Sequence, residues 1–164
     1  MVAGAAVVQA WAFIASERAI VTVPDVRFAK ELVAGLNPLP IFFKMKNSGK
    51  STASVDVLRA VITHALPPNP EYGGAANFTI APIVPNHSAQ RILPFDTAWN
   101  EQTTQQVKAG TLPLFIYGVI DYHDDWRWFA ANRKTGFCFV YRPTGGVRES
   151  VFETCNASAY TYTR

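Results

Sequence analysis

Residues 39–63 read LPIFFKMKNSGKSTASVDVLRAVIT, and this stretch decides the fold class. Two runs rich in β-branched and aromatic residues, 39–46 and 54–63, lie on either side of a polar turn cluster at 47–50. In the first run, Ile41, Phe43 and Met45 alternate with Phe42, Lys44 and Lys46. The first set is therefore expected to pack in a core, and the lysines to face solvent. The pattern predicts two strands joined as a hairpin.

The residues before 39–63 also predict a strand, whereas those directly after this stretch show weaker strand patterns. Residues 20–23 and 26–28 predict one strand that Pro24 interrupts, as at a sheet edge or a β-bulge. Residues 66–90 are rich in Pro and Gly and almost uncharged, which is typical of a long irregular connection. Within this connection we expect one strand at 78–84.

One internal helix is predicted at 97–109, with Asp96 or Thr97 as its N-cap. Gly110 follows at the position where a left-handed residue commonly ends a helix. The body of this helix is polar, so two apolar side chains are expected to hold it on the sheet: Trp99 and Val107.

The remainder of the chain predicts three further strands, at 112–122, 135–141 and 149–155. The last two are expected to form a hairpin across the Pro-Thr-Gly-Gly turn at 143–146. Seven to nine short strands, one brief helix and no βαβ alternation predict a mainly β protein, an immunoglobulin-like antiparallel β-sandwich.

The composition excludes disorder and favours a single folded domain. The chain has 164 residues, of which 49% are hydrophobic and only 16% charged, enough for a full core. The net charge is +3, but the 15 Lys and Arg are scattered singly and form no stripe that would track a phosphate backbone. We therefore expect no nucleic-acid partner, and a β-sandwich domain at 19–164.

Residues 2–15, VAGAAVVQAWAFIA, carry no charge and predict an apolar, Ala-rich N-terminal helix within 1–18. Fourteen residues are fewer than the ~20 that span a bilayer, and the cationic region of a signal peptide is missing. Two interpretations stay open. The segment is either a terminal helix folded onto the domain or the remnant of a longer membrane-proximal anchor or stalk.

Two patterns invite a chemical interpretation without supporting one. Gly49-Lys50-Ser51 matches the end of a phosphate-binding loop, but Lys44 stands where that loop needs glycine, and a strand pattern follows instead of a helix. Asp121, His123 and Asp125 alternate along a strand end and could hold a divalent ion, yet these are also ordinary turn residues. We expect no metal site, no cofactor and no catalytic residue, so that the chain is not an enzyme.

Cys138 and Cys155 lie on the two arms of the last predicted hairpin, where the strand register decides whether they meet. A disulfide and two free thiols therefore both remain open. In an exported domain we expect the disulfide to form.

Several segments together resemble a group of uncharacterised bacterial membrane-anchored envelope proteins, in which a transmembrane helix and an Ala-rich stalk precede a small immunoglobulin-like β domain. The resemblance implies an envelope module and no active-site residues, with Gly49 serving the turn and Gly110 the helix stop. The matching segments are the Ala-rich run ending at 16–19, the turn region 46–53, the segment 108–122, and the segments 136–139 and 155–156.

From these observations the sequence predicts a non-catalytic binding or scaffolding module of the bacterial cell envelope, with the β domain outside the cytoplasm. Protein partners, or self-association through the N-terminal helix, are expected. Two alternatives remain: a pilin-like subunit that assembles through that helix, and a small metal-dependent enzyme that uses Asp121, His123 and Asp125.

Overall fold

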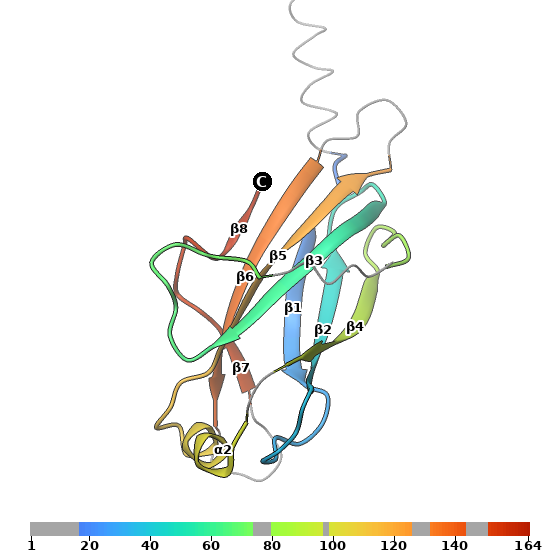
Figure 1. Ribbon diagram of the computed structural model, residues 1–164. Helices are drawn as coiled ribbons and strands as arrows, with labels where there is room; N and C mark the ends of the chain where they lie inside the picture. Colours follow the sequence, from blue (N-terminus) through green and yellow to red (C-terminus); the bar gives the residue numbers. More distant parts are fainter. Residues whose placement is uncertain (1–16, 74–79, 97–98, 126–131, 144–150) are drawn as a thin grey trace, which may run out of the picture.

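The computed structural model describes residues 17–73, 80–96, 99–125, 132–143 and 151–164, and the fold is mainly β (Figure 1). The elements in chain order are β1 (Val21–Phe28), β2 (Leu39–Asn47), β3 (Ala53–Thr63), β4 (Ser88–Phe95), α2 (Glu101–Lys108), β5 (Phe115–Asp124), β6 (Asn132–Arg142), β7 (Val151–Thr154) and β8 (Tyr162–Thr163).

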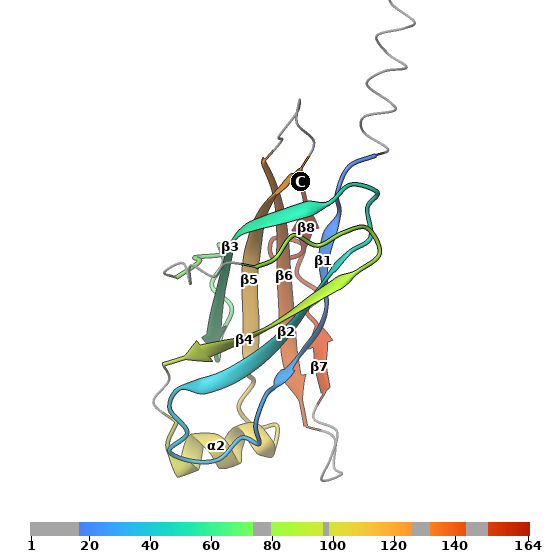
Figure 2. The same ribbon diagram turned by 90° about the vertical axis from the view of Figure 1, so that its right-hand side faces the viewer.

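Two antiparallel sheets pack face to face, as the sequence predicted. One sheet has the order β1-β2-β4, and the other has the order β3-β5-β6-β7, with β8 also paired to β6. Figure 2 shows β1, β2 and β4 in front of the strands of the second sheet. This distribution matches strands A, B and E against C, F and G of immunoglobulin-like sandwiches. In both views the chain enters the sandwich at the end opposite α2.

The edge strands of the three-stranded sheet both contain a proline. In β1 the register with β2 shifts between Thr22 and Asp25, around Pro24, which confirms the interruption predicted there. At the other edge β4 contains Pro94 and pairs with β2 without a shift. Proline cannot donate to a further strand, so these residues protect both edges from unwanted pairing.

The predicted hairpin between 39–46 and 54–63 is wrong, because β2 and β3 belong to different sheets. β2 pairs with β1 and β4, while β3 pairs with β5. The connection between them is an arch whose amides bond to the entering chain: Ser48 N–H donates to Ile20 O and Lys50 N–H to Arg18 O. Those bonds replace the ones that a hairpin turn would have made.

The irregular connection also differs from the prediction. The described part of 78–84 contains no strand; Ile83 forms only an isolated bridge with Ala53. The strand of this region is β4, farther along the chain, and the sequence did not predict it. Leu93 is the one buried side chain of β4, so the alternation that announces a half-buried strand is weak.

The predicted helix is shorter than expected. It spans Glu101–Lys108, and Asn100 is its N-cap, with its side chain accepting from Thr103 N–H at 2.7 Å. Asp96 lies before the helix, and Thr97 lies outside the described residues. Gly110 has a φ of +73°, which confirms its left-handed role after the helix. The predicted anchors are both buried: Trp99 and Val107.

The core lies between the two sheets. Of β2, the predicted inward residues Ile41, Phe43 and Met45 are fully buried, which confirms the alternation. The ring of Phe43 meets that of Phe137 on β6 edge to face, with centroids 5.7 Å apart. Such pairs contribute ~1 kcal/mol beyond the area they bury, and this one fixes the two sheets against each other.

The predicted N-terminal helix at 1–18 falls almost wholly outside the described residues, which begin at Glu17. Among the described residues there is no helix long and apolar enough to cross a membrane.

Candidate functional site

The three residues considered as metal ligands are held by other partners. Asp121 lies 3.2 Å from Lys134 Nζ and 3.9 Å from Arg59 Nη1. Nδ1 of His123 lies 3.0 Å from Asp56 Oδ2, and its Nε2 lies 3.8 Å from Asp125 Oδ1. The structure therefore brings His123 and Asp125 together, but turns Asp121 towards cations.

The start of β3, which contains Asp56, supplies a further contact: Ser54 Oγ donates to Asp125 Oδ1 at 2.5 Å. Across the part of the chain that the structure describes, no three His, Cys, Asp or Glu side chains are arranged to hold a metal ion. The arrangement is a chain of exposed polar contacts between β3 and β5, which ties the two strands together.

Asp124, which the sequence analysis did not single out, lies at the centre of a buried polar cluster. The residue is 6% exposed. Its Oδ1 accepts from Ala19 N–H at 2.6 Å and from Ser51 Oγ at 3.1 Å, and its Oδ2 lies 3.0 Å from Arg133 Nε. A buried carboxylate needs such partners to offset its lost hydration. Asp124 therefore binds the entering chain to the five-stranded sheet.

Asn47, at the end of β2, binds the entering chain to the three-stranded sheet, and its side chain is completely buried. Its Oδ1 accepts from Ile20 N–H at 3.2 Å and from Gly49 N–H at 2.9 Å. Its Nδ2 donates to Ser51 O at 2.7 Å and to Ile83 O at 2.8 Å. All of the hydrogen-bonding capacity of this amide is used, so a substitution leaves buried backbone groups without partners.

Gly49 allows the entering chain to approach the arch closely. A Cβ at this position would lie 2.2 Å from Arg18 O and 2.5 Å from Ile20 N. Beside it, Lys50 Nζ forms an ion pair with Glu17 Oε1 at 2.9 Å. We call Asn47, Gly49, Ser51, Asp124 and Arg133 the entry clamp. These five residues fix the direction in which the chain enters the sandwich.

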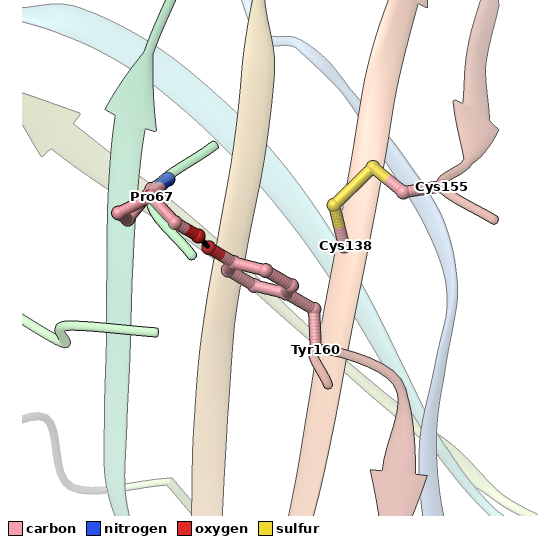
Figure 3. Close-up of a disulfide and its surroundings, with 4 residues drawn as sticks. All are labelled: Pro67, Cys138, Cys155 and Tyr160. Atoms are coloured by element: carbon pink, nitrogen blue, oxygen red, sulfur yellow. Dashed lines mark hydrogen bonds between the residues drawn. A yellow bond between two sulfur atoms is a disulfide. The ribbon is translucent and has the colours of Figure 1, made fainter. Parts of the chain in front are cut away.

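A second, smaller core covers the outer face of the five-stranded sheet. Cys138 on β6 and Cys155 after β7 form a disulfide, with an S–S distance of 2.10 Å and Cα atoms 5.2 Å apart. Figure 3 shows Tyr160 beside this disulfide, reaching across the sheet to donate a hydrogen bond to Pro67 O. The pairing that the sequence left open is therefore made in the structure.

Neighbouring tyrosines complete this outer core. Tyr117 OH donates to Glu71 O at 2.9 Å, and the hydroxyls of Tyr72 and Tyr162 lie 3.4 Å apart. Burial, followed by the contact with Tyr162, raises the pKa of Tyr72, and burial is also the main cause that raises the pKa of Tyr117. These hydroxyls hold the segment after β3 against the sheet in their neutral form.

A groove of about 430 Å³ opens beside this region, between β1 and the strands β6, β7 and β8. Phe137 and Cys138 form part of its apolar lining, and threonine side chains provide most of its hydroxyl groups. The threonines are Thr22, Thr135, Thr154, Thr161 and Thr163. One of them is committed to the fold, because Thr135 Oγ1 donates to Val21 O at 2.7 Å.

The outer face of the three-stranded sheet has a different character. Three successive cross-strand rows of this face, from the chain-entry end, are Thr22-Lys46-Ser88, Asp25-Lys44-Gln90 and Arg27-Phe42-Ile92. Phe42 is 8% exposed because the Arg27 guanidinium lies over its ring, 4.3 Å from the centroid. Ile92 is 55% exposed and is the most exposed large apolar side chain of the described residues.

Comparisons with known proteins add no assignment: the chain matches no protein-family model, no curated protein and no solved structure.

Proposed function

We propose that this chain is a non-catalytic binding or scaffolding module of the bacterial cell envelope, carried on its N-terminal segment. The entry clamp is the observation that carries the proposal. A domain on a flexible linker does not need its first residues held in one direction. Here the buried carboxylate of Asp124 and the buried amide of Asn47 bind the backbone of residues 19 and 20 from both sheets. The clamp suits a module whose orientation on its carrier matters.

Two further observations support the location. Residues 2–15 are apolar and uncharged, as in a segment that inserts into or packs against an apolar environment. The disulfide between Cys138 and Cys155 is of the kind that persists in oxidising compartments such as the bacterial periplasm. Together they favour a β domain outside the cytoplasm.

The test begins with location. The full chain is expressed in a bacterium with alkaline phosphatase, an enzyme active only after export, fused behind residue 164. We expect phosphatase activity, and no reaction of the denatured, unreduced chain with a thiol reagent. Inactive phosphatase together with two reactive thiols would refute the envelope location.

The module itself is tested by microscopy of the purified full chain. Negative staining is expected to show discrete particles at all concentrations. Filaments that grow with concentration would overturn the proposal in favour of a subunit that polymerises through its N-terminal segment.

A further inference from the structure

We propose that the outer face of the three-stranded sheet binds an extended acidic segment of a partner protein, in which two carboxylate side chains alternate and an apolar side chain follows at the next alternate position. The proposal rests on the proposed function, because it names the chemistry of the partner that the module binds. We call Arg27, Phe42, Lys44, Lys46 and Ile92 the cationic face.

The first argument is the distribution of ion pairs. On the five-stranded sheet, Arg59, Lys134 and Arg133 each lie within 4 Å of a carboxylate. On the cationic face, Lys44 and Lys46 form no ion pair with any residue that the structure describes. Asp25 lies opposite Lys44 in the register but forms an ion pair with neither lysine. The three rows of this face therefore carry three cations and one carboxylate, and their net positive charge is complementary to an acidic partner.

The second argument is spacing. Lys46, Lys44 and Phe42 lie at alternate positions of β2, so their side chains leave the same face at intervals of about 7 Å. An extended peptide repeats its side chains at the same interval. A peptide lying along β2 would therefore place two successive carboxylates on the two lysines, with the next side chain in line over Phe42.

The third argument is the apolar end of the row. Beside Phe42 on β4 lies Ile92, which is 55% exposed, and the register pairs these two residues directly. A leucine or aromatic side chain of the partner would cover Ile92 and pack against the Arg27 side chain. Apolar burial at this end adds affinity that the exposed ion pairs alone do not supply.

Pairing at a sheet edge is a less suitable mode for this partner. Pro24 in β1 and Pro94 in β4 remove a backbone donor from each edge strand of this sheet. The face itself has no such obstacle, since its side chains point outward along a regular β2-β4 register. Recognition is therefore expected to depend on side chains of the face rather than on added β-strand hydrogen bonds.

The experiment measures fluorescence anisotropy of a short labelled peptide against the full chain with its disulfide intact. The peptide has glutamate at two alternate positions, leucine at the third, and threonine between them. We expect saturable binding that weakens as salt is raised. The same peptide with glutamine in place of glutamate should bind about tenfold more weakly, because two exposed ion pairs are lost.

Matched variants locate the site. Lys44→Ala with Lys46→Ala should weaken binding of the glutamate peptide about tenfold. Lys108→Ala with Lys134→Ala removes the same charge elsewhere and should leave the affinity unchanged. Ile92→Ser should weaken the glutamate and glutamine peptides by the same factor, because it removes the apolar contact alone.

Three results would overturn the proposal: no binding of the peptide, equal losses in the two double-lysine variants, or binding only to vesicles of phosphatidylglycerol, which would indicate a membrane surface instead. An exported chain that ignores the peptide would refute the partner's chemistry and leave the proposed function standing. A reduced chain retained in the cytoplasm would refute the proposed function, whatever the peptide does.

Discussion

Replacing Asp124 with alanine tests the entry clamp most directly. The substitution removes a carboxylate whose side chain is 7% exposed and leaves Arg133, 17% exposed, without its ion-pair partner. It also removes the acceptor of the buried Ala19 N–H. Removing one partner of a fully buried pair costs about 3–5 kcal/mol, and because Arg133 is partly exposed we expect about 3 kcal/mol here. Because a domain of this size has about 5–15 kcal/mol in total, Asp124→Ala should lose a large part of its stability.

The assay is urea unfolding of the full chain followed by tryptophan fluorescence, together with hydrogen exchange of the Ala19 amide. In a thermal unfolding experiment followed by the same fluorescence, a loss of this size should lower the Tm by about 10 °C. Asp124→Asn keeps an acceptor for Ala19 and should cost less than the alanine variant. The neighbouring Asp125, whose side chain is 40% exposed, is the control, and its alanine variant should cost under about 1 kcal/mol. Equal costs at Asp124 and Asp125, or unchanged exchange at Ala19, would refute the clamp.

Three further predictions concern the arch, the disulfide and the outer tyrosines. Gly49→Ala should destabilise by about 1–3 kcal/mol because its Cβ meets backbone atoms, whereas Gly73→Ala meets only a methyl group at 3.6 Å and should be nearly neutral in the same unfolding assay. Reducing the disulfide, whose cysteines are 17 residues apart, should lower the free energy of unfolding by about 3 kcal/mol, and equal urea midpoints with and without reductant would contradict this. Raised pKa values of Tyr72 and Tyr117 mean that the unfolded chain loses these protons first, so stability should be intact below about pH 10 and fall above it. Stability that stays constant to higher pH would show that these hydroxyls do not couple to folding.

Local patterns in the sequence predicted where the strands lie better than they predicted which strands pair with one another. The alternation in β2 placed Ile41, Phe43 and Met45 in the core because a single strand records its own inward face every second residue. The same pattern does not record which strand lies beside it. The arch after Asn47 has the composition of a hairpin turn. What distinguishes the arch is its hydrogen bonds to the entering chain at residues 18–20, which is remote in sequence.

The disulfide and the entry clamp also differ in how far their residues are apart in the sequence, and therefore in how well they could be predicted. Cys138 lies in β6 and Cys155 directly follows the neighbouring β7. The pair Phe139 with Thr154 is one step away in the register, so the meeting of the two cysteines was predictable to within a residue. The clamp was not predictable, because Ala19 and Asp124 are 105 positions apart. The available signal was the alternation in β5, where Asp124 continues the inward positions of Ile120 and Tyr122, since a buried carboxylate requires partners from elsewhere in the chain.

The position of β2 explains how one strand serves both the clamp and the cationic face. Its side chains alternate, so Asn47 enters the buried clamp while Lys46, one residue earlier, points away from it. A shift of β2 by one residue would expose the side-chain amide of Asn47 and bury the ammonium group of Lys46. Burying an unpaired charge in this way would be strongly unfavourable. The core residues on the inward side therefore fix the register for both features. For this reason, the cationic face is specified by the same packing that specifies the fold, and its lysines remain open to substitution without disturbing the clamp.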